Sequence, residues 1–561
     1  MGIFLNPGYE NFKMTIQSQI YVDKTEMIGY VNSLINTDQR YVAVSRPRRF
    51  GKTTAVNMLC AYYDKSVDSR KLFDGLFISK ISERKNPENP KKSDDKFKNL
   101  DWDIYLNKFN VIRIDMAKYI RKSSSVENFV EIVNDAVSRE IVQNYSDVNF
   151  FDIEDLRLCL ENVYQSTNEK FIIIIDEWDA ILRKFKDDVK AYVTYLDFLR
   201  DLLKDEPYLA LVYMTGILPI KKYGEHSALN MFTEYSMISP MQLAEYVGFT
   251  EKEVKEICCE YHLNFKEIKA WYDGYLVYGN IPLAERKVKN ESEVPCYLYS
   301  PVSVINAALT GRIQNYWNET ETADALKEYI KRNYAGLKED VAILMSGKKL
   351  HIDISTYQND MTTFQSKDDI FTLLIHLGYL GYDSVNRCTF IPNKEVNEVF
   401  RQTTREDEWG YIFKALSDSQ KLLEATWNGN SEEVARFIEE AHMRAGNQTY
   451  NSENALSYAV RLAYFNAEEY YTLIPEMQAG KGYADLVYIP SPKYPDKPAM
   501  LIELKWNKDA QTAIKQIHRQ KYPESLQKYK GNLILVGINY DSEVNHNDIN
   551  FKHHSCSIEK A

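Results

Sequence analysis

One short stretch near the start of this 561-residue chain constrains its fold more than any other. Residues 41–44 form a short apolar run with strand character, residues 46–54 read RPRRFGKTT, and a helical apolar pattern follows. In the order strand, loop, Gly-Lys-Thr and helix, backbone amides at a helix N-terminus bind an anion. Lys52 then reaches the outer phosphates of a nucleotide, and the Thr53 hydroxyl binds Mg²⁺. The stretch therefore predicts a phosphate-binding loop.

The loop departs from the strict pattern at one position. That pattern has glycine five residues before Gly51, where this chain has Arg46. Pro47 follows and steers Arg46 toward extended backbone. An ordinary helix start is therefore the alternative interpretation of Gly51-Lys52-Thr53.

A second motif favours the nucleotide site. Residues 171–175 (FIIII) predict a fully buried strand, and Asp176 and Glu177 follow it directly. In that place Asp176 holds Mg²⁺ through water, and Glu177 orients or deprotonates the attacking water. The alternative is that these acidic residues only cap the following helix. Because both motifs occur in the correct order, we expect ATP and Mg²⁺ as ligands.

Other residues are candidates at the same site. Thr215 ends the apolar run 209–214 and could sense the γ-phosphate, with a simple strand-ending turn as the alternative. Arg48 and Arg49 could neutralise phosphate or reach a neighbouring subunit, with a solvated basic loop as the alternative. The predicted nucleotide-binding set comprises Arg48, Arg49, Phe50, Gly51, Lys52, Thr53, Thr54, Asp176 and Thr215, with Glu177 as the catalytic residue.

The pattern of apolar residues divides the chain. Short apolar runs alternate with amphipathic stretches from 41 to 213, which is typical of an α/β domain with a parallel sheet. Helical patterns dominate from about 234, and residues 370–401 follow the winged-helix order of helix, hairpin and helix. A helical lead-in and an α/β region end the chain. We therefore predict three domains, over residues 1–233, 234–408 and 409–561.

The last domain contains a second candidate site. Asp485 lies on one predicted strand, and Glu503 and Lys505 share one face of the next. A hairpin would bring the carboxylates together to bind a divalent metal, while the lysine activates water or stabilises phosphate charge. The alternative is a solvated edge-strand face, because E-x-K is a weak motif. Gln516 and Tyr522, on a helix expected over 509–528, are supporting candidates.

Composition limits the remaining classes of protein. The net charge of -11 argues against a non-specific nucleic-acid coat but allows a local basic groove. The apolar runs are too short to cross a bilayer and no signal segment opens the chain, so we expect a cytoplasmic protein without membrane contact. The 7 cysteines include no C-x-x-C pair, which favours reduced thiols. His553, His554 and Cys556 are expected in a frayed terminus.

Together these motifs resemble a bacterial and archaeal family that joins an AAA-ATPase-like domain to a PD-(D/E)XK nuclease superfamily domain. In that family R-P-R-R-F-G-K looks like the usual phosphate loop, which accounts for Arg46. The matching segments are 21–25 (YVDKT), 46–53 (RPRRFGKT), 175–179 (IDEWD), 214–220 (MTGILPI), 271–275 (WYDGY), 300–301 (SP), 377–380 (LGYL), 391–393 (IPN) and the set Asp485, Glu503 and Lys505.

The resemblance implies an AAA-like P-loop domain, a mostly helical middle domain with a winged-helix-like part, and a C-terminal restriction-endonuclease-like α/β domain. It also implies that Glu476, at an upstream acidic position, is a further metal or support residue. The chain departs from the family at Tyr483-Ala484, where Gly-Arg is usual, and so lacks one positive side chain.

Three function classes follow. The leading hypothesis is an ATP-hydrolysing protein that controls a Mg²⁺-dependent nuclease acting on DNA. The alternative is a nucleotide-dependent switch or interaction module whose C-terminal domain binds nucleic acid without cutting it, and an ATPase acting on a protein partner is a third class. The sequence leaves open the choice of DNA or RNA and the oligomeric state, and it permits a homo-oligomer.

Overall fold

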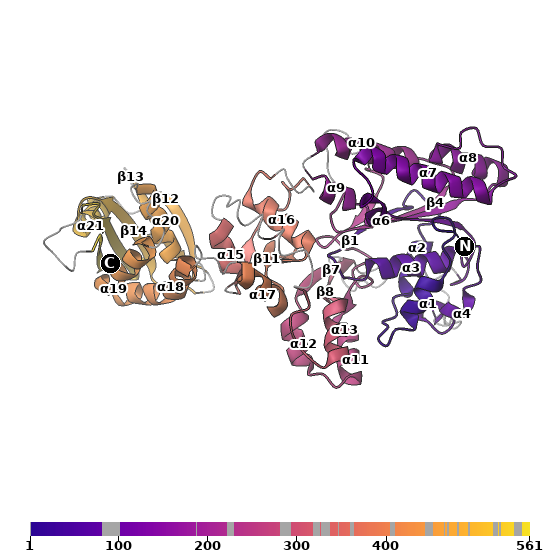
Figure 1. The fold of residues 1–561 in the computed structure, drawn as a ribbon. Coiled ribbons are helices and arrows are strands. Elements are labelled where there is room, and N and C mark those ends of the chain that lie inside the picture. Colours follow the sequence, from indigo (N-terminus) through magenta and orange to yellow (C-terminus); the bar gives the residue numbers. More distant parts are fainter. Residues whose placement is uncertain are drawn as a thin grey trace, which may run out of the picture. The chain divides into compact units, whose positions relative to one another are not determined.

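A computed structural model (Figure 1) shows two compact units, which we describe separately. The first comprises Met1–Leu337 and Gly347–Thr403, and the second comprises Lys338–Ser346 and Thr404–Ala561. The residues that the structure describes are 2–80, 101–186, 188–220, 229–280, 293–317, 326, 337–345, 347–358, 364–403, 410–443, 453–464, 466–467, 470–479, 482–491, 494–519, 526, 529–543 and 552–561. Residues 82–101 are rich in Lys, Asn, Pro and Asp, which predicts an exposed insertion, and they lie almost entirely outside the described residues.

A five-stranded sheet organises the first unit. Its order is β2-β3-β4-β1-β5, and its paired neighbours are parallel. The apolar runs at 41–44, 111–114, 171–175 and 209–213, which predict four strands, are confirmed as strands, and the parallel sheet is confirmed. The short fifth strand extends past residue 233, where the first predicted domain ends. The strands are β1 (Tyr41–Ser45), β2 (Asn110–Asp115), β3 (Phe171–Asp176), β4 (Leu209–Gly216) and β5 (Thr233–Tyr235).

Helices cover both faces of this sheet (Figure 1). Helices α7, α8 and α10 lie on one side, and α1, α2 and α3 lie on the other. Side chains at three helix starts accept backbone amide hydrogen bonds that would otherwise be unmade: Ser125 for α7, Asp155 for α8 and Asp188 for α10. The helices are α1 (Glu10–Ile16), α2 (Glu26–Asn32), α3 (Lys52–Tyr63), α4 (Arg70–Phe73), α5 (Phe77–Lys80), α6 (Met116–Ile120), α7 (Val126–Asn144), α8 (Leu156–Thr167), α9 (Ala180–Lys184) and α10 (Val189–Leu203).

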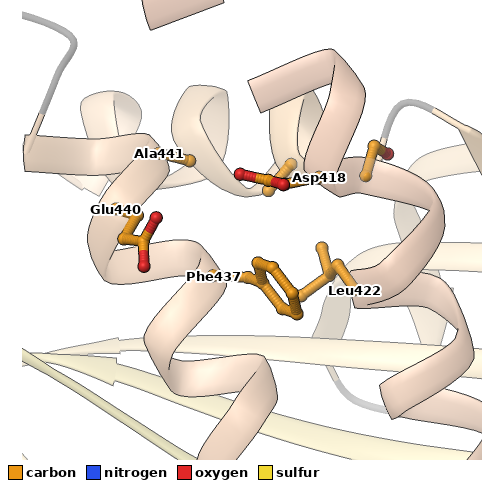
Figure 2. A pocket seen from close by; sticks show the side chains of 7 residues that line it. Asp418, Leu422, Phe437, Glu440 and Ala441 are labelled. Atoms are coloured by element: carbon orange, nitrogen blue, oxygen red, sulfur yellow. The ribbon is translucent and has the colours of Figure 1, made fainter. Parts of the chain in front are cut away.

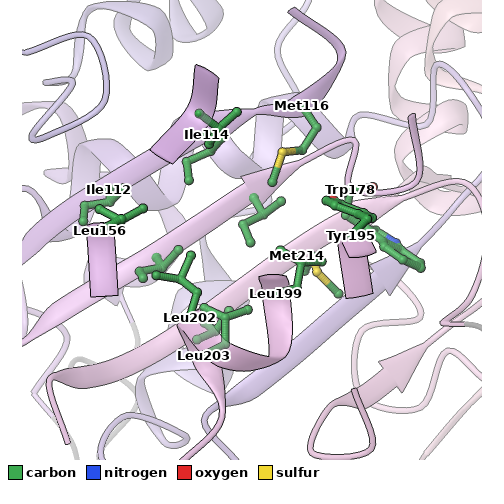
Figure 3. Packing of buried hydrophobic residues seen from close by; sticks show 14 of the residues in the cluster. Ile112, Ile114, Met116, Leu156, Trp178, Tyr195, Leu199, Leu202, Leu203 and Met214 are labelled. Carbon is green, nitrogen blue, oxygen red and sulfur yellow. Dashed lines mark hydrogen bonds between the residues drawn. The ribbon is translucent and has the colours of Figure 1, made fainter. Parts of the chain in front are cut away.

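A large apolar core lies between the sheet and helices α7, α8 and α10 (Figure 3). Ile112 and Ile114 of β2 and Met214 of β4 share it with Leu199 and Leu202 of α10. Burial of each such side chain contributes about 1.5–3 kcal/mol. This core fixes the strands, and so it fixes the carboxyl edge of the sheet, where the polar residues of both N-terminal motifs emerge.

The rest of the first unit contains two small antiparallel sheets and several helices. The predicted order of helix, hairpin and helix at 370–401 is confirmed as α16, β10–β11 and α17. The elements are β6 (Phe249–Thr250), α11 (Glu251–Glu260), α12 (Phe265–Tyr272), β7 (Tyr275–Asn280), β8 (Glu293–Tyr299), α13 (Pro301–Thr310), β9 (Leu350–His351), α16 (Lys367–Leu377), β10 (Gly381–Asp383), β11 (Cys388–Phe390) and α17 (Lys394–Thr403).

Helix α16 is a packing element. All its residues from Asp369 to Leu377 are buried, so this helix has no free face to offer to a DNA groove. It ends at Gly378, whose φ is 89° and where an added Cβ would lie 2.7 Å from the Cβ atom of Pro47. The winged-helix-like part therefore packs directly against the predicted phosphate loop.

A mixed five-stranded sheet organises the second unit, in the order β12-β13-β14-β15-β16. The hairpin predicted around Asp485 and Glu503 is confirmed as the antiparallel pair β13–β14. Of the helix expected over 509–528, the structure describes α21 and residue 526. The elements are α15 (Leu337–Met345), α18 (Gly410–Asn428), α19 (Ser431–Met443), α20 (Glu453–Ala463), β12 (Tyr471–Ala479), β13 (Gly482–Pro490), β14 (Ala499–Trp506), α21 (Ala510–Arg519), β15 (Leu533–Tyr540) and β16 (His554–Lys560).

The prediction of a frayed C-terminus is wrong. Residues 554–560 form the edge strand β16, which pairs with β15 along its whole length. His554 is buried, and its Nδ1 atom is hydrogen-bonded to Glu439 on α19. This strand has no apolar alternation that would predict it, because polar residues dominate it, as they often do on edge strands.

Arg46 joins three segments of the first unit. Its side chain is fully buried, and burial lowers the pKa of its guanidinium to about 10. Nη1 donates hydrogen bonds to the carbonyl oxygens of Ser45 at 3.0 Å and Tyr235 at 2.9 Å, and Nη2 donates to that of Leu243 at 3.4 Å. Its own amide donates to the Gly216 carbonyl at 3.1 Å. Arg46 is thus a structural support for the loop, and glycine could not make these side-chain contacts.

Arg46→Gly, which restores the strict motif, is expected to destabilise the first unit by at least about 3 kcal/mol, because three carbonyl groups lose a buried donor. The matched control is Arg48→Gly in the same loop. Arg48 is only half-buried, so its replacement should cost about 1 kcal/mol, mainly from backbone entropy. Calorimetric unfolding of both variants checks this, and equal losses would contradict a structural role for Arg46.

Candidate functional site

Lys52 lies where the phosphate loop becomes helix α3. Gly51 precedes it with φ of 90°, a conformation that glycine adopts without strain. The Lys52 ammonium is buried and donates hydrogen bonds to the carbonyl oxygens of Arg46 and Pro47, both at 2.9 Å. Burial lowers the pKa of Lys52 to about 8, although nearby carboxylates oppose the shift. Thr53 and Thr54 are exposed in the first helical turn.

Asp176 and Thr215 meet at the carboxyl edge of the sheet. Asp176 is 2% exposed at the end of β3, and the Thr215 hydroxyl on neighbouring β4 donates a 2.5 Å hydrogen bond to its Oδ1. The same hydroxyl oxygen accepts a hydrogen bond from the Glu177 amide at 3.4 Å. Thr215 therefore contacts both acidic residues of the second motif, which a simple strand-ending turn does not require.

Glu177 has an unusual backbone conformation. Its φ is 53°, in the left-handed region that non-glycine residues rarely adopt, and such strain clusters at functional sites. Its side chain is partly exposed, and Oε2 accepts a 2.7 Å hydrogen bond from Arg183. Burial alone raises the pKa of Glu177, but Arg183, followed by Lys52 and Arg48, outweighs it, so the pKa is lowered. Glu177 is thus held as a carboxylate.

Two other predicted loop residues contact the part of the first unit that follows residue 233, which we call the middle segments. Phe50 is fully buried, with its ring centroid 5.2 Å from that of Tyr275. Arg49 is half-buried with φ of 66°, and its Nη1 donates to the Tyr316 carbonyl at 3.5 Å. Phe50 and Arg49 therefore connect the loop to the middle segments, whereas Arg48 acts electrostatically on Glu177.

Sequence reasoning missed four charged residues at this edge. Arg113 on β2 lies 3.7 Å from Asp176 and also donates to Asn57 on α3. Asp115 ends β2 beside Asp176, and burial raises its pKa. The position of Asp115 at the end of an apolar run could have revealed it. Asp179 and Arg183 follow the strand of the second motif at the i,i+4 spacing of a helix. Their contact could be recognised only from the structure, which shows helix α9 there.

The C-terminal residues also come together. The Asp485 carboxylate on β13 accepts a 2.7 Å hydrogen bond from the Leu504 amide on β14. The Lys505 ammonium donates to Glu503 Oε1 at 2.8 Å and to the Leu504 carbonyl at 3.0 Å. Gln516 on α21 donates to the same Glu503 oxygen. Asp485, Glu503, Lys505 and Gln516 thus form one polar cluster on the sheet.

Glu503 has an unsatisfied oxygen. The residue is 2% exposed, and Oε2 is buried with no hydrogen-bond partner among the described residues. Burial raises the pKa of Glu503, and the negative charge of Asp485 raises it further. A buried carboxylate oxygen without a partner is costly unless a cation or water satisfies it. Glu503 and Asp485 therefore fit a divalent cation.

Gly537 allows helix α21 to approach this cluster. It pairs with Glu503 across the parallel strands β14 and β15. An added Cβ would lie 2.4 Å from the Ala510 carbonyl oxygen and 2.9 Å from the Ala513 Cβ atom. The close approach brings Gln516 to Glu503, and this contact required the three-dimensional structure to recognise.

The two remaining supporting residues are only partly described. Glu476 lies on β12, between Pro475 and Met477, which pair with Leu486 and Ala484 on β13, but its side chain is outside the described part. Tyr522 lies outside the described residues altogether. Among the described residues, no group of three or more His, Cys, Asp or Glu side chains could hold a metal ion, so this part of the chain supplies Asp485 and Glu503 alone.

Figure 2 shows a pocket in the second unit. Helices α18, α19 and α20 line it, with Asp418, Leu422, Phe437 and Glu440 among its walls. None of the predicted site residues lines this pocket.

None of the described helices is both long and apolar enough to cross a membrane.

Family models match the two regions of the chain that contain the candidate sites. A family described as "Predicted AAA-ATPase" matches residues 7–224, and the PD-(D/E)XK nuclease superfamily matches residues 453–548. A search of curated proteins found no match.

Two solved structures from Aeropyrum pernix are also similar, each with 11% sequence identity. The ORC2 protein in ADPNP and ADP complexes covers 69% of this chain and 96% of its own, with a TM-score of 0.26. The ORC1 protein in complex with DNA covers 73% and 98%, with a TM-score of 0.23. At these TM-scores the likeness supports no argument. From the family matches and its own sheets, the chain combines an AAA-ATPase-like domain at its N-terminus with a PD-(D/E)XK nuclease superfamily domain at its C-terminus.

Proposed function

We propose that this protein binds and hydrolyses ATP, and that its nucleotide state controls a Mg²⁺-dependent nuclease that acts on DNA. The observation that carries the proposal is the arrangement at the first sheet edge. Lys52, Asp176 and Glu177 come from separate parts of the sequence, yet they lie within electrostatic range of one another. A cytoplasmic location and a homo-oligomer remain predictions.

Each residue of the ATP site has a separate role. Lys52 leaves the two loop carbonyls and pairs with the outer phosphates, whose charge replaces those weaker acceptors. Thr53 and Asp176 hold Mg²⁺, which neutralises phosphate charge when bound. Glu177 accepts a proton from the attacking water, since its lowered pKa keeps it ionised at neutral pH. Thr215 holds Asp176 and Glu177 in place through the hydrogen bonds of its hydroxyl group.

In the nuclease site, Asp485 and Glu503 would hold the metal, which lowers the pKa of a bound water when present. The buried Oε2 atom of Glu503 supports this assignment. Lys505 lies 2.8 Å from Glu503, where its ammonium stabilises negative charge on a cleaved phosphodiester. Gln516 orients the Glu503 carboxylate.

For the ATP site, Glu177→Gln is expected to keep ATP binding and to lower the hydrolysis rate about 10²–10⁴-fold, because the amide cannot accept the proton. Lys52→Ala should instead weaken ATP binding. The control Lys122→Ala removes an exposed lysine after α6 and should change neither. Phosphate release and calorimetric ATP titration measure both effects, and full hydrolysis by Glu177→Gln would exclude it as the base.

For the nuclease site, the parent protein with Mg²⁺ or Mn²⁺ and ATP is expected to cut plasmid DNA. Glu503→Gln and Lys505→Ala should abolish cutting, because each removes a charge that acts at the scissile phosphate. Lys530→Ala, at an exposed position in the same unit, is the control.

Other outcomes of this assay identify the rival functions. DNA binding without cutting under every metal and nucleotide combination favours a non-cleaving nucleic-acid-binding domain. Failure to bind either DNA or RNA favours an ATPase acting on a protein. Unchanged cutting by Lys52→Ala would show that the two sites are independent.

A further inference from the structure

Arg183 bridges two carboxylates that follow strand β3. Its Nη2 atom donates a 2.7 Å hydrogen bond to Glu177, and its Nε atom lies 3.3 Å from Oδ2 of Asp179. The Arg183 side chain is only 16% exposed. A guanidinium group is planar and has donors on several sides, so it can hold two carboxylates in a fixed relation.

Asp179 is the rigid end of this bridge. It is fully buried, and Oδ2 accepts hydrogen bonds from the amides of Ile217 at 3.2 Å and Leu218 at 3.1 Å. These amides belong to the segment that leaves β4 just after Thr215. Gly216 also packs tightly there, because an added Cβ would lie 2.5 Å from Nε1 of Trp178. Arg183 therefore starts from a fixed support.

Glu177 is the end that needs support. Its side chain is 35% exposed, and its strained backbone is held by a long amide hydrogen bond to Thr215. A partly exposed glutamate has several rotamers, and ordering it costs conformational entropy. A general base must lie within hydrogen-bond distance of the water that it deprotonates, so an unrestrained Glu177 would lose efficiency.

We infer that Arg183 is a positioning residue of the ATP site, which holds the Glu177 carboxylate against Asp179 and acts through Glu177 rather than by binding phosphate. This inference rests on the proposed ATP hydrolysis. It assigns a role to a residue outside both sequence motifs, and it links the catalytic carboxylate to the end of strand β4.

The contacts around Glu177 show what is specific to Arg183. Two other cations act on Glu177, Lys52 from α3 and Arg48 from the phosphate loop, and both remain when Arg183 is replaced. The replacement removes the link between the Glu177 carboxylate and the buried carboxylate of Asp179. The hydrolysis rate should therefore fall while nucleotide binding, which uses other residues, stays unchanged.

The test compares the full-length parent with Arg183→Ala, Arg183→Lys and Arg183→Gln. ATP hydrolysis is measured to give kcat and KM, and nucleotide affinity is measured by titration with ADP and Mg²⁺. Arg183→Ala is expected to lower kcat about 10–100-fold, as misplacement of a catalytic group does, with KM and ADP affinity unchanged. Arg183→Lys keeps a charged donor at this position and should restore part of kcat.

Arg200→Ala is the matched control. Arg200 also lies near two carboxylates, Asp197 and Asp201 on α10, but its side chain is 41% exposed and it has no place in the site. Its removal should leave kcat and KM unchanged. If Arg183→Ala does not fold, Arg183→Gln keeps a donor for Asp179 without the charge, and it should still lower kcat with ADP affinity unchanged.

Three results would overturn the inference. ADP affinity that falls in Arg183→Ala as it does in Lys52→Ala would make Arg183 a phosphate ligand. A slower rate in Arg183→Ala with a matching loss of folded protein by circular dichroism would make its role purely structural, and an unchanged rate would give it no role. If the parent protein itself hydrolyses no ATP, the proposed function fails first and this inference fails with it, which distinguishes that case from the other three.

Discussion

The buried guanidinium of Arg46 is the contact on which the first unit depends most. A charged group is costly in a protein interior unless hydrogen bonds replace its water, and here the carbonyl groups of Ser45, Tyr235 and Leu243 accept them from Nη1 and Nη2, while Nε has no hydrogen-bond partner among the described residues. These carbonyls belong to β1, to β5 and to the segment that leads toward β6. One side chain thus fixes the start of the phosphate loop relative to the sheet and to the middle segments. The arginine that looks like a defect in the motif is a structural requirement of this fold.

Each candidate site has a glutamate at a sheet, and the surroundings of the two glutamates shift their pKa values in opposite directions. In the first, cations surround Glu177 and lower its pKa, so the carboxylate is ready to accept a proton. In the second, burial raises the pKa of Glu503, and one of its oxygens has no hydrogen-bond partner among the described residues, so this carboxylate fits a cation. The same residue type therefore suits a base in one sheet and a metal ligand in the other, because the neighbouring charges differ.

The sequence predicted the elements with strong local patterns. Uniformly apolar runs such as residues 171–175 identified the parallel strands, and the spacing of Glu503 and Lys505 placed both on one strand face. It could not predict contacts made by packing, such as Gln516 reaching Glu503 because Gly537 admits α21. The polar strand β16 also lacked a pattern, since it is specified by pairing with β15 rather than by its own alternation.

The phosphate loop has two kinds of contact. Lys52 is placed to bind the proposed ligand, and Pro47 packs against the middle segments. The Lys52 ammonium donates a hydrogen bond to the carbonyl group of Pro47, while the Pro47 ring packs where Gly378 ends helix α16. In the proposed nucleotide complex the ammonium pairs with phosphate instead, so the Pro47 carbonyl loses this hydrogen bond. Close-packed interiors transmit small displacements, and the end of helix α16 is one of the parts of the first unit that pack against this loop. Because residues 369–377 of α16 are buried, the winged-helix-like part is better suited to respond to nucleotide than to read DNA.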